Sequence, residues 1–298
     1  MRRTLFSVLA VCLAAPLMLA QFGGREDEVV IYMVSVKGNP NPVIVPSTTA
    51  NTQTGFEVKD PLSMPLEPFG PDFAGEFFVT LHTEAADSFR FIVQRERILT
   101  QHNTFAGPAK LMIIQGLDRL LIPNKEPVDL TAGLFAPFPQ GVDFGPELPM
   151  MEANSFMWTP SPVFPLLRPA DPSFISSLTP PGFTGSEYVL QLGQFVALIP
   201  WIGLNQIYGA GWPQGIDQRL IEQDNSLGST VRMIRLRPGR QTPTFVIRAN
   251  THLAVLQGSI DIVPANGTAR TLTAKQYAFI PNGFAISLAN PVTYSGPK

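Results

Sequence analysis

The sequence contains little from which to build a disulfide, a metal site or a strongly charged surface. Among its 298 residues there are one cysteine and three histidines, and charged residues make up 15%, against roughly 25% in typical soluble domains. The formal net charge is −2 and no basic run occurs. Nucleic acid is therefore not an expected partner.

The single cysteine, Cys12, lies in a segment with the layout of a secretory signal peptide. Arg2 and Arg3 precede an apolar stretch that ends in a small residue at Ala20. We predict cleavage after Ala20, so that residues 1–20 are a leader and the protein is secreted or periplasmic. The mature chain then has no cysteine, and an ordinary hydrophobic core must hold it together without disulfides.

No segment beyond the leader has the sequence of a membrane span. The most apolar one, Tyr188 to Leu204, is too short and contains Gln191, Gln194 and Pro200. We interpret it as two buried strands with a bend at the proline.

Proline and phenylalanine, in contrast, are abundant, with 30 and 21 residues. Short apolar runs rich in Val, Ile and Phe alternate with Gly, Asn and Pro turns, and no long run has helical periodicity. The Asn-Gly pair at Asn266 is typical of a hairpin turn, because it supplies the positive φ that tight turns need. The sequence therefore predicts an all-β protein.

The chain also contains an internal repeat. Leu111–Gly141 and Leu253–Gly283 align without a gap at an offset of 142 residues, and ten of the 31 positions are identical. Between them lies a segment with nine prolines and no strand pattern, and proline removes the backbone donors that a sheet requires. We predict one barrel over residues 21–144, a Pro-rich connector over 145–184 and a second barrel over 185–298.

The second copy resembles the cupin superfamily, and the two-copy layout resembles a bicupin. The family's first motif is Gly, His-x-His, Glu and a closing Gly; its second is Gly, Pro-x-Gly, His and Asn. Here Gly239 and Gly258 frame the first motif, and Pro281, Gly283 and Asn290 match the second. The resemblance implies two double-stranded β-helix (jelly-roll) barrels, each with its site inside the barrel.

The histidines and the glutamate that would bind a metal are missing. Carried over from the motifs, the ligand positions of the second copy hold Phe245, Ile247, Thr251 and Ile286. The same offset gives Asn103, Phe105, Ala109 and Phe144 in the first copy. Neither set can hold a transition metal, so we expect no metal and no other cofactor. These residues become candidates for lining a ligand pocket.

Two kinds of function follow from this pattern. The barrels serve either as packing or assembly units, with a homo-oligomer as one form of assembly, or as pockets for an apolar or sugar-like small molecule. The enzymatic alternative is a divergent cupin, either a dioxygenase of the flavonol-dioxygenase kind or a sugar isomerase or epimerase. Strand alternation predicts that His102 and His252, which neighbour ligand positions, point away from the barrel interior.

Overall fold

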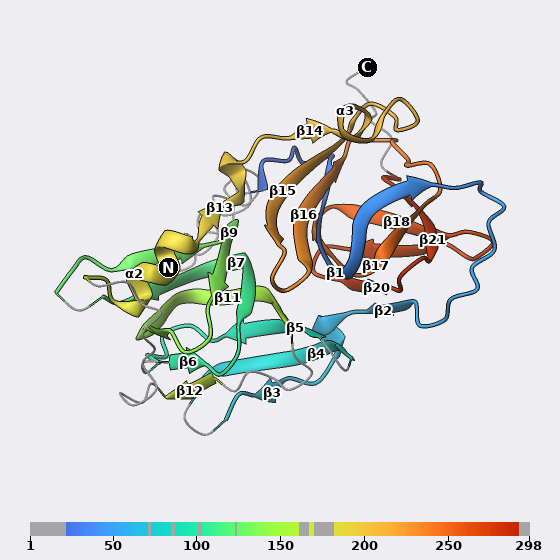
Figure 1. The fold of residues 1–298 in the computed structure, drawn as a ribbon. Coiled ribbons are helices and arrows are strands. Elements are labelled where there is room, and N and C mark those ends of the chain that lie inside the picture. Colours follow the sequence, from blue (N-terminus) through green and yellow to red (C-terminus); the bar gives the residue numbers. More distant parts are fainter. Residues whose placement is uncertain are drawn as a thin grey trace, which may run out of the picture. The chain divides into compact units, whose positions relative to one another are not determined.

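The computed structural model describes residues 22–70, 73–84, 87–100, 103–122, 124–160, 167–169 and 182–291. The predicted leader, residues 1–20, and His102 lie outside these ranges. The described residues are mostly β strand, which confirms the all-β prediction (Figure 1). The strands are β1 (Val29–Ile44), β2 (Glu57–Lys59), β3 (Glu67–Pro68), β4 (Glu76–Glu84), β5 (Asp87–Gln94), β6 (Asn103–Phe105), β7 (Ala109–Leu120), β8 (Val128–Thr131), β9 (Leu134–Phe138), β10 (Asp143–Phe144), β11 (Glu147–Thr159), β12 (Leu167–Pro169), β13 (Gln194–Phe195), β14 (Ile202–Gly203), β15 (Ile216–Asp224), β16 (Ser229–Leu236), β17 (Phe245–Gln257), β18 (Ser259–Pro264), β19 (Arg270–Thr273), β20 (Tyr277–Ile280) and β21 (Ala285–Ala289). The helical elements are η1 (Pro61–Ser63), α2 (Gly185–Leu192), η2 (Val196–Leu198) and α3 (Leu204–Tyr208).

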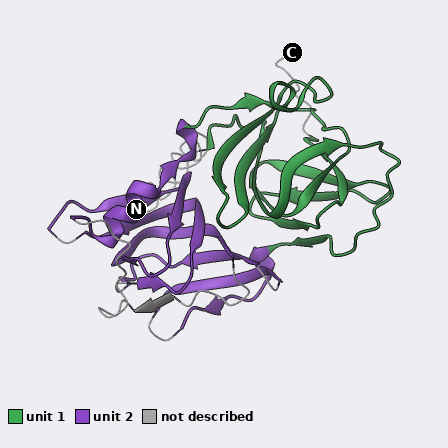
Figure 2. Cartoon of the chain, in the orientation of Figure 1, with its two compact units in different colours: residues 1–60, 199–298 green, residues 61–198 purple. Residues whose placement is uncertain are grey.

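The chain forms two compact units, and their boundaries differ from the predicted ones. Unit 1 joins the chain up to Asp60 with the segment from Ile199 onward, and unit 2 comprises Pro61–Leu198 (Figure 2). The reason is β1, which lies between β16 and β17 in the 10-stranded sheet and pairs with both. The N-terminal strand thus belongs to the barrel that the C-terminal part of the chain builds. The predicted barrel limits at 21–144 and 185–298 are therefore wrong.

The predicted connector over residues 145–184 is also wrong in its first part. Residues 147–159 form β11, a 13-residue strand in unit 2 that pairs with β7 and β5 on its two sides. Pro149 is accommodated because it lies at a register shift of the β7 ladder, where a missing N–H is tolerated. The high proline content of residues 145–184 therefore does not exclude a strand at Glu147–Thr159.

The apolar segment Tyr188–Leu204 contains a helix where two strands were predicted. α2 covers its beginning, and Thr184 and Glu187 form a capping box at the helix start, each accepting a hydrogen bond from the other's backbone N–H. This local capping outweighs the apolar, strand-like composition. No helix within the described ranges is long and apolar enough to cross a membrane.

The internal repeat is confirmed by the strand registers. In unit 2 Ala109 pairs with Phe138, and in unit 1 Thr251 pairs with Ile280, so the two ladders are displaced by the same 142 residues. The β7–β8 ladder of unit 2 and the β18–β19 ladder of unit 1 show the same displacement. The first copy of the repeat is therefore the wall of unit 2, and the second copy is the wall of unit 1.

Turns with a positive φ recur at the same offset. Gly116 and Gly258 have φ of 87° and 79°, and Asn124 and Asn266 have φ of 60° and 57°. A Cβ on Gly116 would lie 2.1 Å from the carbonyl oxygen of Glu152, so only glycine fits at that position. The positive φ at these positions accounts for glycine and asparagine at the same places in both copies, although most other residues differ.

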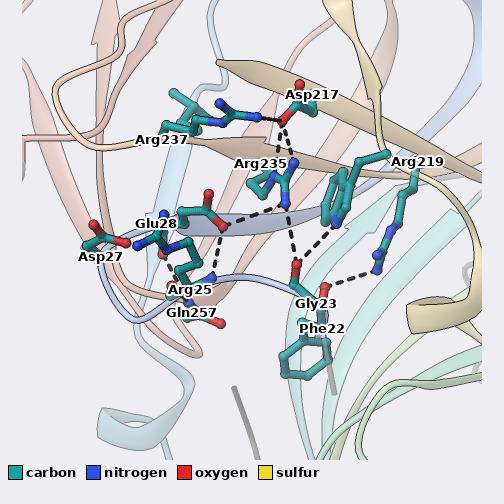
Figure 3. A network of polar contacts seen from close by, with 12 residues as sticks. Phe22, Gly23, Arg25, Asp27, Glu28, Asp217, Arg219, Arg235, Arg237 and Gln257 are labelled. Atoms are coloured by element: carbon teal, nitrogen blue, oxygen red, sulfur yellow. Dashed lines mark hydrogen bonds and ion pairs between the residues drawn. The ribbon is translucent and has the colours of Figure 1, made fainter. Parts of the chain in front are cut away.

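The first described residues are held by a polar network on unit 1 (Figure 3). Arg219 donates to the carbonyl of Phe22 at 3.0 Å, and the indole of Trp201 donates to the carbonyl of Gly23 at 3.3 Å. The Trp201 ring contacts two guanidinium groups, those of Arg219 at 4.2 Å and Arg235 at 4.8 Å. This network fixes the chain just before it enters β1.

Candidate functional site

The ligand positions of unit 1 form part of a packed apolar core. Phe245 pairs with Ile286 across the β17–β21 ladder, and both join Ile247 in one buried cluster. The Trp212 ring covers this cluster, 5.4 Å from the ring of Phe245. Thr251 is also buried, but its hydroxyl is engaged by Ser35 and by a backbone carbonyl. None of the four side chains offers a free metal donor.

The corresponding positions of unit 2 are occupied mainly by phenylalanine. Phe105 and Phe144 stack at 5.4 Å, and Phe138 lies 4.7 Å from Phe144. Asn103 pairs with Phe144 as Phe245 pairs with Ile286, so the assigned register holds in both units. Ala109 is buried in the same cluster. The Asn103 side chain is fully buried, and neither of its amide atoms has a hydrogen-bond partner.

His252 lies on the β17 face opposite to the barrel interior, as strand alternation predicts. The interior cluster includes Ala249, Leu253 and Val255 but not His252. Its Nδ1 is 2.8 Å from the hydroxyl of Tyr277. His252 therefore cannot replace a missing metal ligand inside the barrel.

One group in the described part of the chain has the compactness of a metal site. His82, Glu84 and Asp87, at the ends of β4 and β5, bring one donor atom each within 4.8 Å of one another. His82 Nε2 and Glu84 Oε1 are 3.4 Å apart, and Glu84 is exposed. None of these residues belongs to the cupin ligand positions.

The interior of unit 2 contains a cavity of about 40 Å³. By the usual requirement of at least about 10–15 Å³ per water molecule, it has room for a few non-hydrogen atoms. Apolar side chains form one part of its wall and polar ones another. The apolar lining residues are Phe69, Ile92, Phe105, Leu111, Ile113, Leu130, Ala136, Phe138, Phe144, Ala153 and Met157; the polar ones are Glu76, Gln94, Asp118, Glu147, Asn154 and Ser155.

Three carboxyl groups gather at the polar end of this cavity, and we call Glu76, Asp118 and Glu147 the acid cluster. Glu76 faces Gln94 across the β4–β5 ladder, and Gln94 donates to Glu147 Oε2 at 3.3 Å. All three carboxyl groups are buried. Within the described residues, Glu76 Oε1 and Asp118 Oδ1 have no hydrogen-bond partner. Among the described residues, no lysine or arginine lines the cavity.

Burial changes the charge of the acid cluster. It raises the pKa of Glu76 to about 8, with a smaller contribution from the charge of Asp118. Burial also raises the pKa of Asp118 to about 6, against hydrogen bonds from Glu147, the Arg119 backbone and Gln94. The pKa of Glu147 is raised well above its usual range, first by burial and then by the charges of Asp118 and Glu76. At neutral pH Glu76 is thus mainly protonated and Asp118 mainly ionised, while burial favours the protonated form of Glu147.

Sequence reasoning missed the acid cluster because its members come from β4, β7 and β11, far apart in the chain. Each one interrupts or borders an apolar run, as in Glu76-Phe-Phe-Val and Leu117-Asp118. An isolated carboxylate in a strand of otherwise apolar residues is a usable signal, since acids are rarely buried without a reason. It does not reveal which other acids it meets.

No protein-family model and no curated protein matches the sequence. Solved structures do resemble it. An oxalate decarboxylase from Lactobacillus farciminis matches with a TM-score of 0.52 at 12% identity, over 84% of this chain and 86% of that one. An oxalate decarboxylase from Bacillus subtilis matches with a TM-score of 0.52 at 9% identity, over 82% and 76% of the two chains. A Nostoc punctiforme protein with a proposed dioxygenase activity matches with a TM-score of 0.53 at 12% identity, over 80% and 78%.

These likenesses show the fold alone, because the identities are too low to carry an activity from one protein to the other. They agree with the division of the chain into two β-rich units. The chain has the fold of a bicupin. The positions that the cupin motifs give to histidine and glutamate hold Phe, Ile, Thr, Asn and Ala here.

Proposed function

We propose that this protein with a bicupin fold is an exported small-molecule binding protein that works without a transition metal, and that unit 2 holds the ligand. The observation that carries the proposal is the cavity of unit 2. Buried polar groups in folded proteins nearly always have hydrogen-bond partners, yet Glu76 Oε1 and Asp118 Oδ1 line this cavity without one. A ligand hydroxyl group would supply the missing partner.

The lining defines the ligand class. The phenylalanine end accepts an apolar group, while the acid cluster offers both donors and acceptors, because the carboxyl group of Glu76 is protonated at neutral pH and that of Asp118 is ionised. A hydroxyl group also donates and accepts. The cavity of about 40 Å³ favours a small alcohol, or the hydroxyl end of a larger molecule, over a whole sugar ring.

Methyl NMR of methionine-labelled protein tests this proposal. Met157 lines the cavity, so its methyl resonance, assigned with Met157→Leu, reports occupancy. A ligand of four non-hydrogen atoms gains at most about 6 kcal/mol, so 1-propanol and 2-propanol are titrated to tens of millimolar. We expect saturable shifts of the Met157 signal. Ala136→Leu fills the cavity and should abolish them, whereas Ala197→Leu, on the surface of unit 2, should not.

If folded wild-type protein shows no saturable Met157 shift with these alcohols, unit 2 is not a pocket of this class. Export is tested separately. The secreted form should begin at Gln21, which N-terminal sequencing of the protein outside the cytoplasm would establish.

Proton transfer is a second candidate function, supported by the pair formed by Asp118 and Glu76. At neutral pH Glu76 is mainly protonated and Asp118 mainly ionised, so a carboxylic acid and a carboxylate line one cavity. Such a pair suits a metal-free isomerase or epimerase that acts on a compound of a few non-hydrogen atoms. Exchange of a carbon-bound hydrogen of glycolaldehyde in D₂O, lost in Asp118→Asn, would support it. A dioxygenase is less suited, because the ligand positions cannot hold its metal.

A further inference from the structure

The interior of unit 1 contains a buried arginine without a carboxylate partner. Arg232 lies on β16, on the face that also contributes Ile234 to the core, and only 3% of its surface is exposed. Its Nη1 donates to the hydroxyl of Tyr208 at 3.2 Å and to Gln218 Oε1 at 3.3 Å. Both partners are neutral, and Arg232 forms no ion pair with any described residue.

The charge of Arg232 cannot be removed by releasing a proton. Burial lowers the pKa of its guanidinium, but an arginine stays protonated under physiological conditions. A buried charge is ordinarily paired, because desolvation is costly and neutral partners compensate only in part. An anion inside unit 1 would supply the missing countercharge.

One edge of the guanidinium is free to hold such an anion. Nη1 is occupied by Tyr208 and Gln218, whereas Nε is buried and has no hydrogen-bond partner in the described part of the chain. The Nε–Nη2 edge presents two parallel N–H donors, which match the two oxygens of a carboxylate and also attract a halide.

A small cavity lies beside this arginine. It measures about 20 Å³ and is lined by Arg232, Gln218, Thr242 and the ring of Trp212, among others. Thr242 Oγ1 accepts from the backbone N–H of Leu288 at 2.8 Å, so its hydroxyl hydrogen is left to donate. At about 10–15 Å³ per water molecule, the space holds one or two non-hydrogen atoms, which suits a halide ion.

The repeat provides an internal comparison. Arg90 precedes Arg232 by 142 residues and is buried at the matching position of unit 2. Its guanidinium lies over the ring of Phe78 at 5.8 Å, and the charge of Glu67 favours its protonated form. The arginine of unit 2 therefore has an acid of its own chain nearby, while that of unit 1 has only a phenol and an amide.

We propose that unit 1 binds a small monovalent anion on the free Nε edge of Arg232. The ligand class is a halide, because the cavity is too small for the four non-hydrogen atoms of acetate. This site is distinct from the alcohol pocket proposed for unit 2, because it lies in the other barrel and binds an anion instead of a neutral hydroxyl group.

Thermal unfolding at constant ionic strength tests this site. Sodium gluconate, whose carboxylate is attached to a chain too long for the cavity, serves as the background salt, and sodium acetate or sodium chloride replaces it in steps. At ten times the dissociation constant we expect the Tm of the wild-type protein to rise by about 3–6 °C. The rise is expected with chloride; acetate, with four non-hydrogen atoms, is too large for the cavity and should not produce it.

Arg232→Gln should abolish this rise. Arg237→Gln, which removes an exposed arginine from the same unit, should keep it. Since Arg232→Gln can fail to fold, ³⁵Cl line broadening by wild-type protein, relieved by bromide, provides a second measurement. The proposal is overturned if chloride has no larger effect on the Tm than acetate and gluconate and shows no such broadening, or if folded Arg232→Gln responds as the wild type does. The Met157 signal of unit 2 reports the alcohol pocket independently.

Discussion

Replacing Glu76 with glutamine should make the protein more stable, and increasingly so as the pH rises. Burial raises the pKa of Glu76 from 4.5 to about 8 in the folded protein, while the unfolded chain keeps the ordinary value. Between these two pH values the folded state holds a proton that the unfolded state has released. The free energy of unfolding therefore falls as the pH rises from about 4.5 to about 8, and changes little above that.

The size of this effect follows from the two pKa values. Their difference of about 3.5 corresponds to an upper limit of roughly 5 kcal/mol, at 1.36 kcal/mol per pH unit. Glutamine is nearly isosteric and neutral at every pH, so Glu76→Gln loses this slope. We expect the variant and the wild type to have similar stabilities at pH 4, and the variant to exceed the wild type by several kcal/mol at pH 8.

Urea denaturation at pH 4, 5, 6, 7 and 8 measures this difference, with Trp158 fluorescence reporting on unit 2. Glu126→Gln, an exposed position in the same unit, is the matched control and should show a difference from wild type that does not vary with pH. A difference between Glu76→Gln and wild type that is constant from pH 4 to pH 8 would refute the reasoning. So would a wild-type protein that gains stability relative to the variant over this range.

Three further outcomes are expected. Phe245→Ala should cost about 3–5 kcal/mol in urea denaturation because the ring is buried in the core of unit 1, whereas the half-exposed Ile202→Ala should cost far less; a small loss for Phe245→Ala would mean that its site is not tightly packed. Elemental analysis of the purified protein should find no stoichiometric iron, manganese, nickel, copper or zinc, and a metal retained after chelator treatment would instead implicate the group around His82. Trp201→Ala removes the ring between two arginines, worth about 1–2 kcal/mol, so amide hydrogen exchange in residues 22–28 should accelerate about tenfold; unchanged exchange would show that the network does not hold this segment.

The barrel walls could be predicted from sequence because their turns depend on local residues. Gly116 and Gly258 occupy backbone conformations that other residues avoid, so they persist in both copies and mark the offset. Phe245 and Ile286 could be placed together for the same reason, since the Pro-x-Gly turn fixes the strand that follows it. The ligand positions could therefore be located from local turn residues, although the residues around them differ between the two copies.

Contacts between distant segments could not be predicted in this way. Nothing within Val29–Ile44 indicates that its partners are β16 and β17 rather than the strands that come next in the chain. The acid cluster likewise depends on three strands meeting, and Arg232 looks like any strand arginine until its surroundings are known. The prolines in and around β11 led to the prediction of a connector where the structure has a central strand.

The division of unit 1 into two chain segments also fixes the order in which the barrels can be completed during synthesis. Val29 of β1 pairs with Leu236 of β16, so about 200 residues must follow before its partner exists, which takes about 10–40 s at 5–20 residues per second. Meanwhile Pro61–Leu198 emerges as one continuous piece with all its own strands. The first eight residues of β1 are buried on both faces in the finished protein, and until β16 and β17 appear they are an unpaired apolar strand. Unit 2 can therefore fold first, and unit 1, although its N-terminal strand is made earliest, is completed last.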